Sequence, residues 1–249
     1  MISFIVVVLE KPQNSKFKII KKLKMVKDKY LSKLITPSQM RGGCVMLNEQ
    51  ITGMVIENIT EISFIKLYPN LLLHLYDNNI LSKFNIEIPN EVITKLKHLF
   101  DNGLEHIQEN KTWMNSLWIK ELRPIGHEMI DLFYQYMEMF YQDVINLIPY
   151  NWLYIDTDTL FFVDDEKGNI TNKFIKNLYT PIPYDFERRN LAFFEAKKRY
   201  IIADNNNTLK QKGFLSYGRQ NKMRHKRHDE IVTIMKSHIR DTQLCQILS

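Results

Sequence analysis

Apolar and polar positions follow patterns that predict both strands and helices along this chain. Residues 2–9 form a run of apolar and small side chains, which is typical of a buried strand. The lysine-rich range 11–33 carries interleaved apolar residues, which favours an amphipathic helix with a basic face. Residues 55–73 have strand character until Pro69, which is expected to end the strand or to mark a sheet edge.

Helical patterns dominate the middle of the chain and return near its end. Helical stretches are expected within 79–99, with a stop at Asn102-Gly103. A second helix is predicted over 105–122, followed by a long amphipathic helix over 129–148 whose aromatic stripe is expected to pack in the core. The remaining predicted elements are a helix at 186–196, a strand at 198–203 and a helix at 229–246.

Two aspartates, Asp156 and Asp158, lie one residue apart between apolar runs at 151–154 and 160–163. This pattern predicts a strand–turn–strand hairpin that presents carboxylates at its tip. Carboxylate oxygens are hard ligands that suit Mg²⁺ or Mn²⁺ and leave coordination positions for water and phosphates. The alternative is a hairpin turn without metal, because Asp and Thr are ordinary turn residues.

Composition narrows the class of protein only moderately. The 249 residues, 45% of them hydrophobic, carry a formal net charge of +6, which suits a polyanionic partner but is also common in proteins that bind none. Cys44 and Cys245 lie far apart, so a disulfide framework is not expected and a reducing intracellular compartment, nucleus or cytoplasm, fits better. No segment is long and apolar enough to predict a membrane partner.

The range 42–213 contains four short motifs. In chain order they are SFIKLYPN at 63–70, KTWMNSLW at 111–118, YIDTDT at 154–159, and KKRY at 197–200 followed by Lys212-Gly213. They resemble the DFxSLYPS, KxxxNSxYG, YxDTDS and KKRY…KG motifs of family B (α-like) DNA polymerases. By this resemblance the chain is similar to the palm and fingers of a divergent viral or mobile-element enzyme of that family.

The resemblance implies an α+β fold in which an antiparallel palm sheet carries the hairpin, helices pack on the sheet, and the fingers are a short helical insertion. The implied divisions are an N-terminal strand and basic helix (1–50), a first palm part (51–89), reduced fingers (90–123), a second palm part with the hairpin (124–205), and a basic tail or start of a thumb (206–249).

The activity that the resemblance implies is that of a DNA-directed DNA polymerase, which extends a primer 3′ end with two Mg²⁺ ions, or with Mn²⁺. Asp158 would be the main metal ligand, with Asp156 in support. The implied partners are primer–template DNA and deoxynucleoside triphosphates.

Further roles follow from the same resemblance. Lys111 would face the triphosphate, Asn115 would support the nucleotide pocket, and Tyr68 would lie beneath the sugar. The alternatives are a solvated lysine, a surface asparagine and a half-buried core aromatic. The residues that would contact the DNA backbone are Lys197, Lys198, Arg199 and Lys212. The basic cluster at 222–228 extends that footprint or is a solvated linker.

The chain departs from the family pattern at Ser63, where the family has its first catalytic aspartate. A neutral hydroxyl is a poor substitute for a bridging carboxylate. Glu61 would share a strand face with Ser63, but it would lie about 6.5–7 Å away along the strand. Glu61 is therefore a candidate replacement ligand. The rival interpretations are a catalytically silent primer–template-binding module and one fragment of a split polymerase that further polymerase chains complete.

Overall fold

The computed structural model describes residues 28–39, 41–165, 167–177, 180–204, 206–213 and 228–240, with the backbone alone at 6–10, 18–22 and 174–177. The chain divides into two compact units. The first unit comprises Met1–Gly43, Phe64–Val144 and Leu178–Pro183, and the second comprises Cys44–Ser63, Ile145–Asn177 and Tyr184–Ser249. Within the described residues, every helix is too short or too polar to cross a bilayer.

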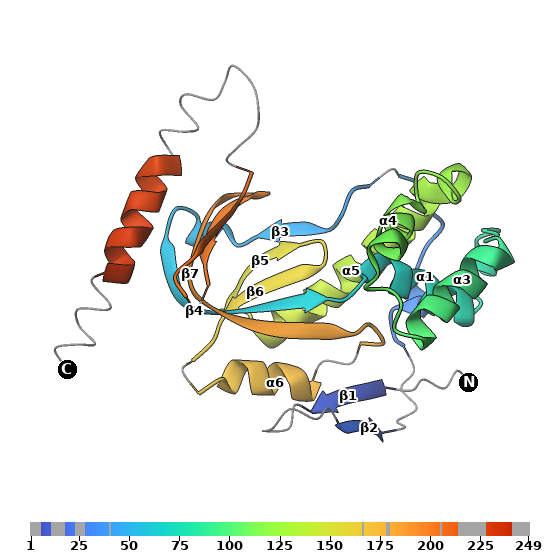
Figure 1. Cartoon of the computed structure of the whole chain (residues 1–249), viewed down its shortest axis with the longest axis horizontal. Helices are drawn as coiled ribbons and strands as arrows, with labels where there is room; N and C mark the ends of the chain where they lie inside the picture. Colours follow the sequence, from blue (N-terminus) through green and yellow to red (C-terminus); the bar gives the residue numbers. More distant parts are fainter. Residues whose placement is uncertain are drawn as a thin grey trace, which may run out of the picture. The chain divides into compact units, whose positions relative to one another are not determined.

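A seven-stranded sheet carries the predicted hairpin (Figure 1). Its strands are β3 (Val45–Leu47), β4 (Val55–Phe64), β5 (Trp152–Asp156), β6 (Thr159–Val163), β7 (Tyr184–Ala196), β8 (Arg199–Ala203) and β9 (Leu209–Lys212). They lie in the order β3-β5-β6-β4-β7-β8-β9. The β3–β5, β5–β6, β4–β6, β7–β8 and β8–β9 pairs are antiparallel, so the predicted α+β class with an antiparallel sheet is confirmed.

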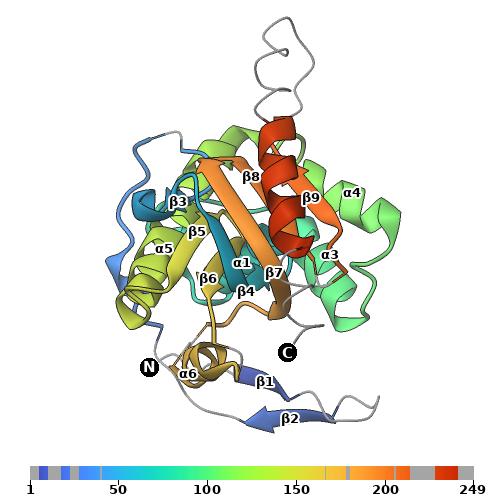
Figure 2. The same ribbon diagram turned by 90° about the vertical axis from the view of Figure 1, so that its left-hand side faces the viewer.

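The part of the sheet around β7 and β8 is buried on both faces. Ala192, Phe194 and Ile202 share one apolar cluster with residues of β4, β5 and β6. Leu191, Phe193, Ile201 and Ala203 pack on the opposite face against Ile231 and Met235 of a helix at 228–240. Figure 2 shows this helix, coloured red, alongside β7 and β8. The predicted C-terminal helix is thus confirmed for 228–240, and its expected continuation to 246 lies outside the described residues.

The helix predicted over 186–196 is wrong, because these residues belong to β7. Both faces of this strand are buried from Leu191 to Phe194, so these residues form a continuous apolar run without the alternation of a half-exposed strand. Such a run does not distinguish a buried strand from a buried helix. The neighbouring prediction of a strand at 198–203 is confirmed by β8.

Helices make up most of the described part of the first unit. They are α1 (Leu67–Asp77), α2 (Ile80–Lys83), α3 (Asn90–Asp101), α4 (Gln108–Ser116) and α5 (Gly126–Leu147, whose last residues enter the second unit), with 3-10 turns η1 (Leu31–Lys33) and η3 (Arg123–Ile125). The second unit contributes α6 (Asn169–Asn177) and η2 (Glu49–Ile51). The helices predicted within 79–99, 105–122 and 129–148 are confirmed, although α4 is shorter than predicted.

Two local predictions fail. Pro69 does not end a strand: β4 stops at Phe64, and Pro69 lies in the first turn of α1, where a missing amide hydrogen is tolerated. The basic helix predicted over 11–33 is also wrong, because Lys18–Lys22 forms β2, which pairs antiparallel with β1 (Val6–Glu10). Adjacent β-branched isoleucines in β2 favour a strand despite the flanking lysines. Residues 11–17 and 23–27 lie outside the described residues.

A buried polar network fastens the segment from Asp28 onwards to α1 and α5. Asp28 accepts hydrogen bonds from the Tyr136 hydroxyl at 2.7 Å and the Tyr30 amide at 2.9 Å, and its other contact is His74 Nε2 at 2.6 Å. Burial alone would raise the pKa of Asp28, but the hydrogen bonds of His74 and Tyr136 bring it below the usual value. Asp28 is therefore charged, and its hydrogen bonds hold this segment of the first unit against α1 and α5.

Candidate functional site

The hairpin between β5 and β6 has a two-residue turn. Asp156 is the last residue of β5 and pairs with Thr159, the first residue of β6. Thr157 has a left-handed φ of 63°, and its amide donates to the Cys44 carbonyl at 2.7 Å. The turn therefore has a defined conformation, tied to the chain just before β3. The predicted hairpin is confirmed.

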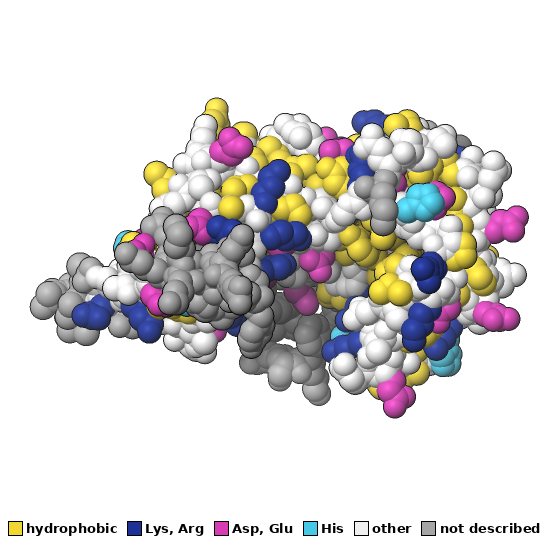
Figure 3. Space-filling view, turned by 90° about the horizontal axis from the view of Figure 1, so that it is seen from above, with side chains coloured by type: hydrophobic (Ala, Val, Ile, Leu, Met, Phe, Trp, Pro, Cys, Tyr) yellow, Lys and Arg dark blue, Asp and Glu magenta, His cyan; other side chains and the backbone are white. Residues whose placement is uncertain are grey.

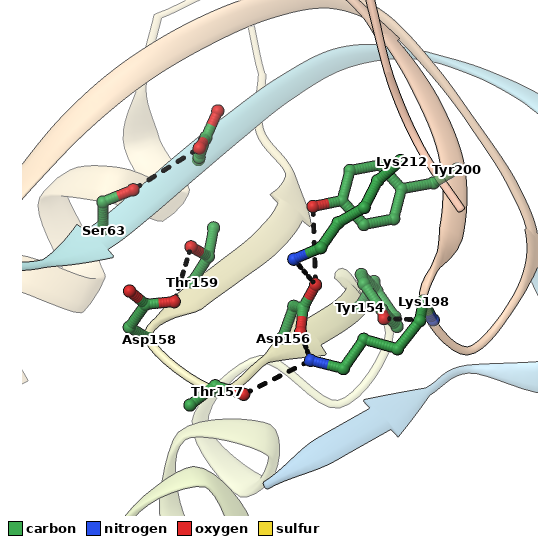
Figure 4. Close-up of polar contacts among 10 residues, drawn as sticks. Ser63, Tyr154, Asp156, Thr157, Asp158, Thr159, Lys198, Tyr200 and Lys212 are labelled. Carbon is green, nitrogen blue, oxygen red and sulfur yellow. Dashed lines mark hydrogen bonds and ion pairs between the residues drawn. The ribbon is translucent and has the colours of Figure 1, made fainter. Parts of the chain in front are cut away.

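Asp156 is buried beneath two lysines. Its side chain is 1% exposed, and it is ion-paired with Lys198 and with Lys212, the latter at 2.6 Å (Figure 4). The Tyr200 hydroxyl donates to the same carboxylate at 3.5 Å. Burial alone would raise the pKa of Asp156, but the two ammonium groups lower it below the usual value. Asp156 is therefore an anion at neutral pH.

The local backbone brings both lysines to this carboxylate. Lys212 on β9 pairs directly with Tyr200 on β8, so their side chains share one face of the sheet. Lys198 lies in the turn before β8 with a φ of 62°, and its amide donates to the Tyr154 hydroxyl at 2.7 Å. The Tyr154 and Tyr200 rings meet edge to face at 5.3 Å, and burial raises the pKa of Tyr154 to about 12. The KKRY…KG spacing is thus explained by one compact arrangement.

Gly213 is required by this arrangement. It has a φ of 77°, and a Cβ atom there would lie 1.9 Å from the Lys198 carbonyl oxygen. Gly53 has a similar φ of 80°, but a Cβ atom there would meet no other atom within 4 Å. We therefore expect Gly213→Ala to lower the free energy of unfolding by about 2–3 kcal/mol, through backbone strain plus overpacking. Gly53→Ala should lower it by about 1 kcal/mol, through strain alone. Urea denaturation of both variants checks this, and equal losses would contradict the proposed collision.

Asp158 differs from Asp156 in its surroundings. Its side chain is exposed, and its carboxylate accepts a hydrogen bond from the Thr159 hydroxyl at 3.5 Å. Neighbouring protein atoms displace part of the water around the carboxylate, and this desolvation raises the pKa of Asp158. The negative charge of Asp156 raises the pKa further. A bound cation would relieve that unfavourable charge.

Ser63 and Glu61 lie on β4 beside the hairpin. Ser63 pairs with Thr159, and its hydroxyl donates to Glu61 at 3.4 Å. Glu61 in turn forms an ion pair with Arg189 of β7 at 2.5 Å, and the Arg189 side chain is only 5% exposed. Arg189 also pairs with Glu187. Glu61 is therefore held by a buried guanidinium.

These residues do not fit the pair of metal ions that the motifs imply. Asp156 forms ion pairs with two ammonium groups, and Glu61 forms an ion pair with Arg189. The side chain of Ser63 is neutral. Across the described ranges, no three His, Cys, Asp or Glu side chains converge as a metal site would require. Asp158 is the remaining carboxylate at the tip, and one carboxylate does not bridge two ions.

The predicted nucleotide-binding residues all lie in the other unit. Tyr68 on α1 is half-buried and stacks on Phe133 at 5.3 Å between ring centroids. This agrees with the alternative that Tyr68 is a half-buried core aromatic. Lys111 and Asn115 lie one helical turn apart on α4, with Asn115 exposed. Their roles stay predictions, as do the five divisions of the chain.

The remaining predicted DNA-binding residues flank the lysine pair. Lys197 is exposed, and Arg199 forms an ion pair with Glu195 at 3.2 Å. Figure 3 shows several Lys and Arg side chains near one another on one face, with Asp or Glu and hydrophobic side chains beside them. Of the basic cluster at 222–228, all but His228 lies outside the described residues. Sequence reasoning missed Tyr200 and Arg189 as partners of the acidic side chains, and the tyrosine of KKRY was the available signal for the first.

Comparison with known proteins gives a structural likeness only. No family model matches the sequence, and no curated protein does. The family B DNA polymerase of the hyperthermophilic archaeon Pyrobaculum calidifontis is 15% identical, with a TM-score of 0.43, over 74% of this chain and 31% of its own. Phi29 DNA polymerase, in a complex with single-stranded DNA, is 11% identical, with a TM-score of 0.49, over 78% of this chain and 55% of its own. The likeness to these two polymerases extends over about three quarters of this chain, which spans about a third and about half of their own lengths.

Proposed function

We propose that this chain is the palm and fingers part of a family B-type DNA polymerase and that it binds primer–template DNA at the hairpin end of the sheet. The observation that carries the proposal is the pair of ion pairs that Lys198 and Lys212 form with Asp156. The aspartate and the two lysines belong to two of the four polymerase-like motifs. The five divisions of the chain given above belong to this proposal.

Phosphate binding suits the chemistry of this cluster. The side chains of Lys198 and Lys212 are each 50% exposed although both ammonium groups contact Asp156. An ammonium group has three donors, so each lysine can also bind a phosphate oxygen. Lys197 and Arg199 lie on either side of Lys198 in sequence and add positive charge. Contacts of this kind fix the register of a nucleic acid without reading its sequence.

We expect Lys198→Met and Lys212→Met each to weaken primer–template binding. Loss of one phosphate contact lowers the slope of log K against log salt by about 0.9, which is roughly eightfold in affinity at 0.1 M salt. Lys236→Met is the matched control, because this exposed lysine lies on the helix that covers the opposite face of the sheet. Fluorescence anisotropy at several salt concentrations measures the slopes. Equal losses in all three variants would contradict a localised site.

Nucleotidyl transfer from deoxynucleoside triphosphates is the second candidate function, favoured by the exposed carboxylate of Asp158 at the hairpin tip. Lys111, Asn115 and Tyr68 are the nucleotide-binding residues of this proposal. Primer extension with Mg²⁺ or Mn²⁺ tests it: extension that Asp158→Ala abolishes supports a polymerase. Absence of extension by the parent chain favours a silent binding module or one part of a split polymerase.

A further inference from the structure

Protein cations already neutralise the carboxylates on one face of the sheet. Asp156, Thr159 and Ser63 occupy directly paired positions on β5, β6 and β4, so their side chains share this face. Glu61 lies two residues from Ser63 and therefore on the same side. Asp156 is bound by two ammonium groups and Glu61 by the guanidinium of Arg189.

The groups in direct contact with Asp156 favour an anion over a cation. One buried carboxylate faces two ammonium groups, so these three side chains together carry one positive charge, which the nearby carboxylate of Asp158 offsets in part. A divalent ion would have to displace both lysines before it reached Asp156, and it would meet their repulsion on the way. A phosphate oxygen would instead meet two half-exposed donors that a buried residue holds in place.

We propose that the hairpin end of the sheet binds phosphodiester groups of a nucleic acid strand without any divalent metal, with the lysine pair acting as a built-in cation. Asp156 is then a positioning residue for Lys198 and Lys212, and it is not a metal ligand. This inference rests on the proposed DNA-binding function and adds that the binding is independent of metal.

The first test compares primer–template binding by the full chain in EDTA and in Mg²⁺ at matched ionic strength. We expect the dissociation constant in EDTA to be no larger than that in Mg²⁺, since a site without metal loses nothing when the ion is removed and Mg²⁺ competes with the lysines for the phosphates. In both buffers Lys198→Met should weaken binding, and Lys236→Met should not. Binding that EDTA weakens tenfold would overturn the metal-independent site while leaving the DNA-binding function intact. Absence of binding in both buffers would overturn both.

The second test separates positioning from metal binding through Asp156→Asn. Loss of the carboxylate frees both lysines, so we expect the salt slope of DNA binding to fall even though a negative charge has been removed. The affinity for Mn²⁺ alone, measured by electron paramagnetic resonance of the free ion, should equal that of the parent chain within about twofold. A loss of Mn²⁺ binding with an unchanged salt slope would show that Asp156 is a metal ligand and would overturn the proposal. Circular dichroism confirms that the variant is folded.

Discussion

Ser63→Asp is expected to bind Mn²⁺ roughly thirtyfold more tightly than the parent chain. The new carboxylate would lie on β4 directly opposite Thr159. Thr159 is the residue that follows the exposed Asp158. At about 4 Å in water a unit charge attracts a dication by about 2 kcal/mol, which corresponds to that factor. Titration followed by electron paramagnetic resonance of free Mn²⁺ measures the change, and primer extension by the variant should exceed that of the parent.

The same substitution should destabilise the chain when no metal is present. The Ser63 hydroxyl donates to Glu61 at 3.4 Å, and an aspartate there would repel that carboxylate by about 1 kcal/mol. Mn²⁺ should restore the stability, because the ion binds only the folded arrangement. Ser63→Asn is the matched control, since it has the same shape without the charge. If Asn and Asp raise the Mn²⁺ affinity equally, the charge argument fails.

Local patterns predicted most of the fold. The hairpin at Asp156 and Asp158 and the long helix α5 both follow from short-range periodicity and turn residues. The failure at 186–196 occurs where the environment of a segment is set elsewhere in the chain. The apolar run at 191–194 does not alternate because the helix at 228–240 buries the second face of β7 there. Sequence periodicity does not reveal such a covering element.

The candidate site was predicted in its residues but not in its pairings. Asp156, Lys198 and Lys212 were all named, yet the sequence assigned the aspartate to metal and the lysines to DNA. Their ion pairs join residues 42 and 56 positions apart in the chain, so they depend on tertiary structure that no local pattern reveals. Glu61 was a candidate ligand by strand geometry, whereas its partner Arg189 lies 128 positions away. Motifs give residue types and order, and the charge balance at a site depends on tertiary pairing.

Asp28→Ala is expected to destabilise the first unit more than the loss of an exposed carboxylate does. The Asp28 side chain is 7% exposed, and its removal leaves the buried His74 and the Tyr136 hydroxyl without their acceptor. Removing the acceptor of a buried polar group costs about 1–3 kcal/mol for each group. Asp143→Ala is the control, because Asp143 is 40% exposed and binds Lys29 and Tyr30 of the same segment at the protein surface. That variant should lose about 1 kcal/mol or less. Similar losses would mean that burial does not decide the effect.

The pH dependence of the free energy of unfolding provides a second test of the role of Asp28. Asp28 has a lowered pKa in the folded chain, so the unfolded chain binds more protons as the pH falls. Its stabilising contribution is complete above the unfolded value of about 3.9 and disappears as the pH drops through the lower folded value. The gap in unfolding free energy between the parent chain and Asp28→Asn should therefore narrow as the pH falls below about 4. Urea denaturation at each pH measures it. A gap that widens in acid would show that the charged form of Asp28 is not what anchors this segment to α1 and α5.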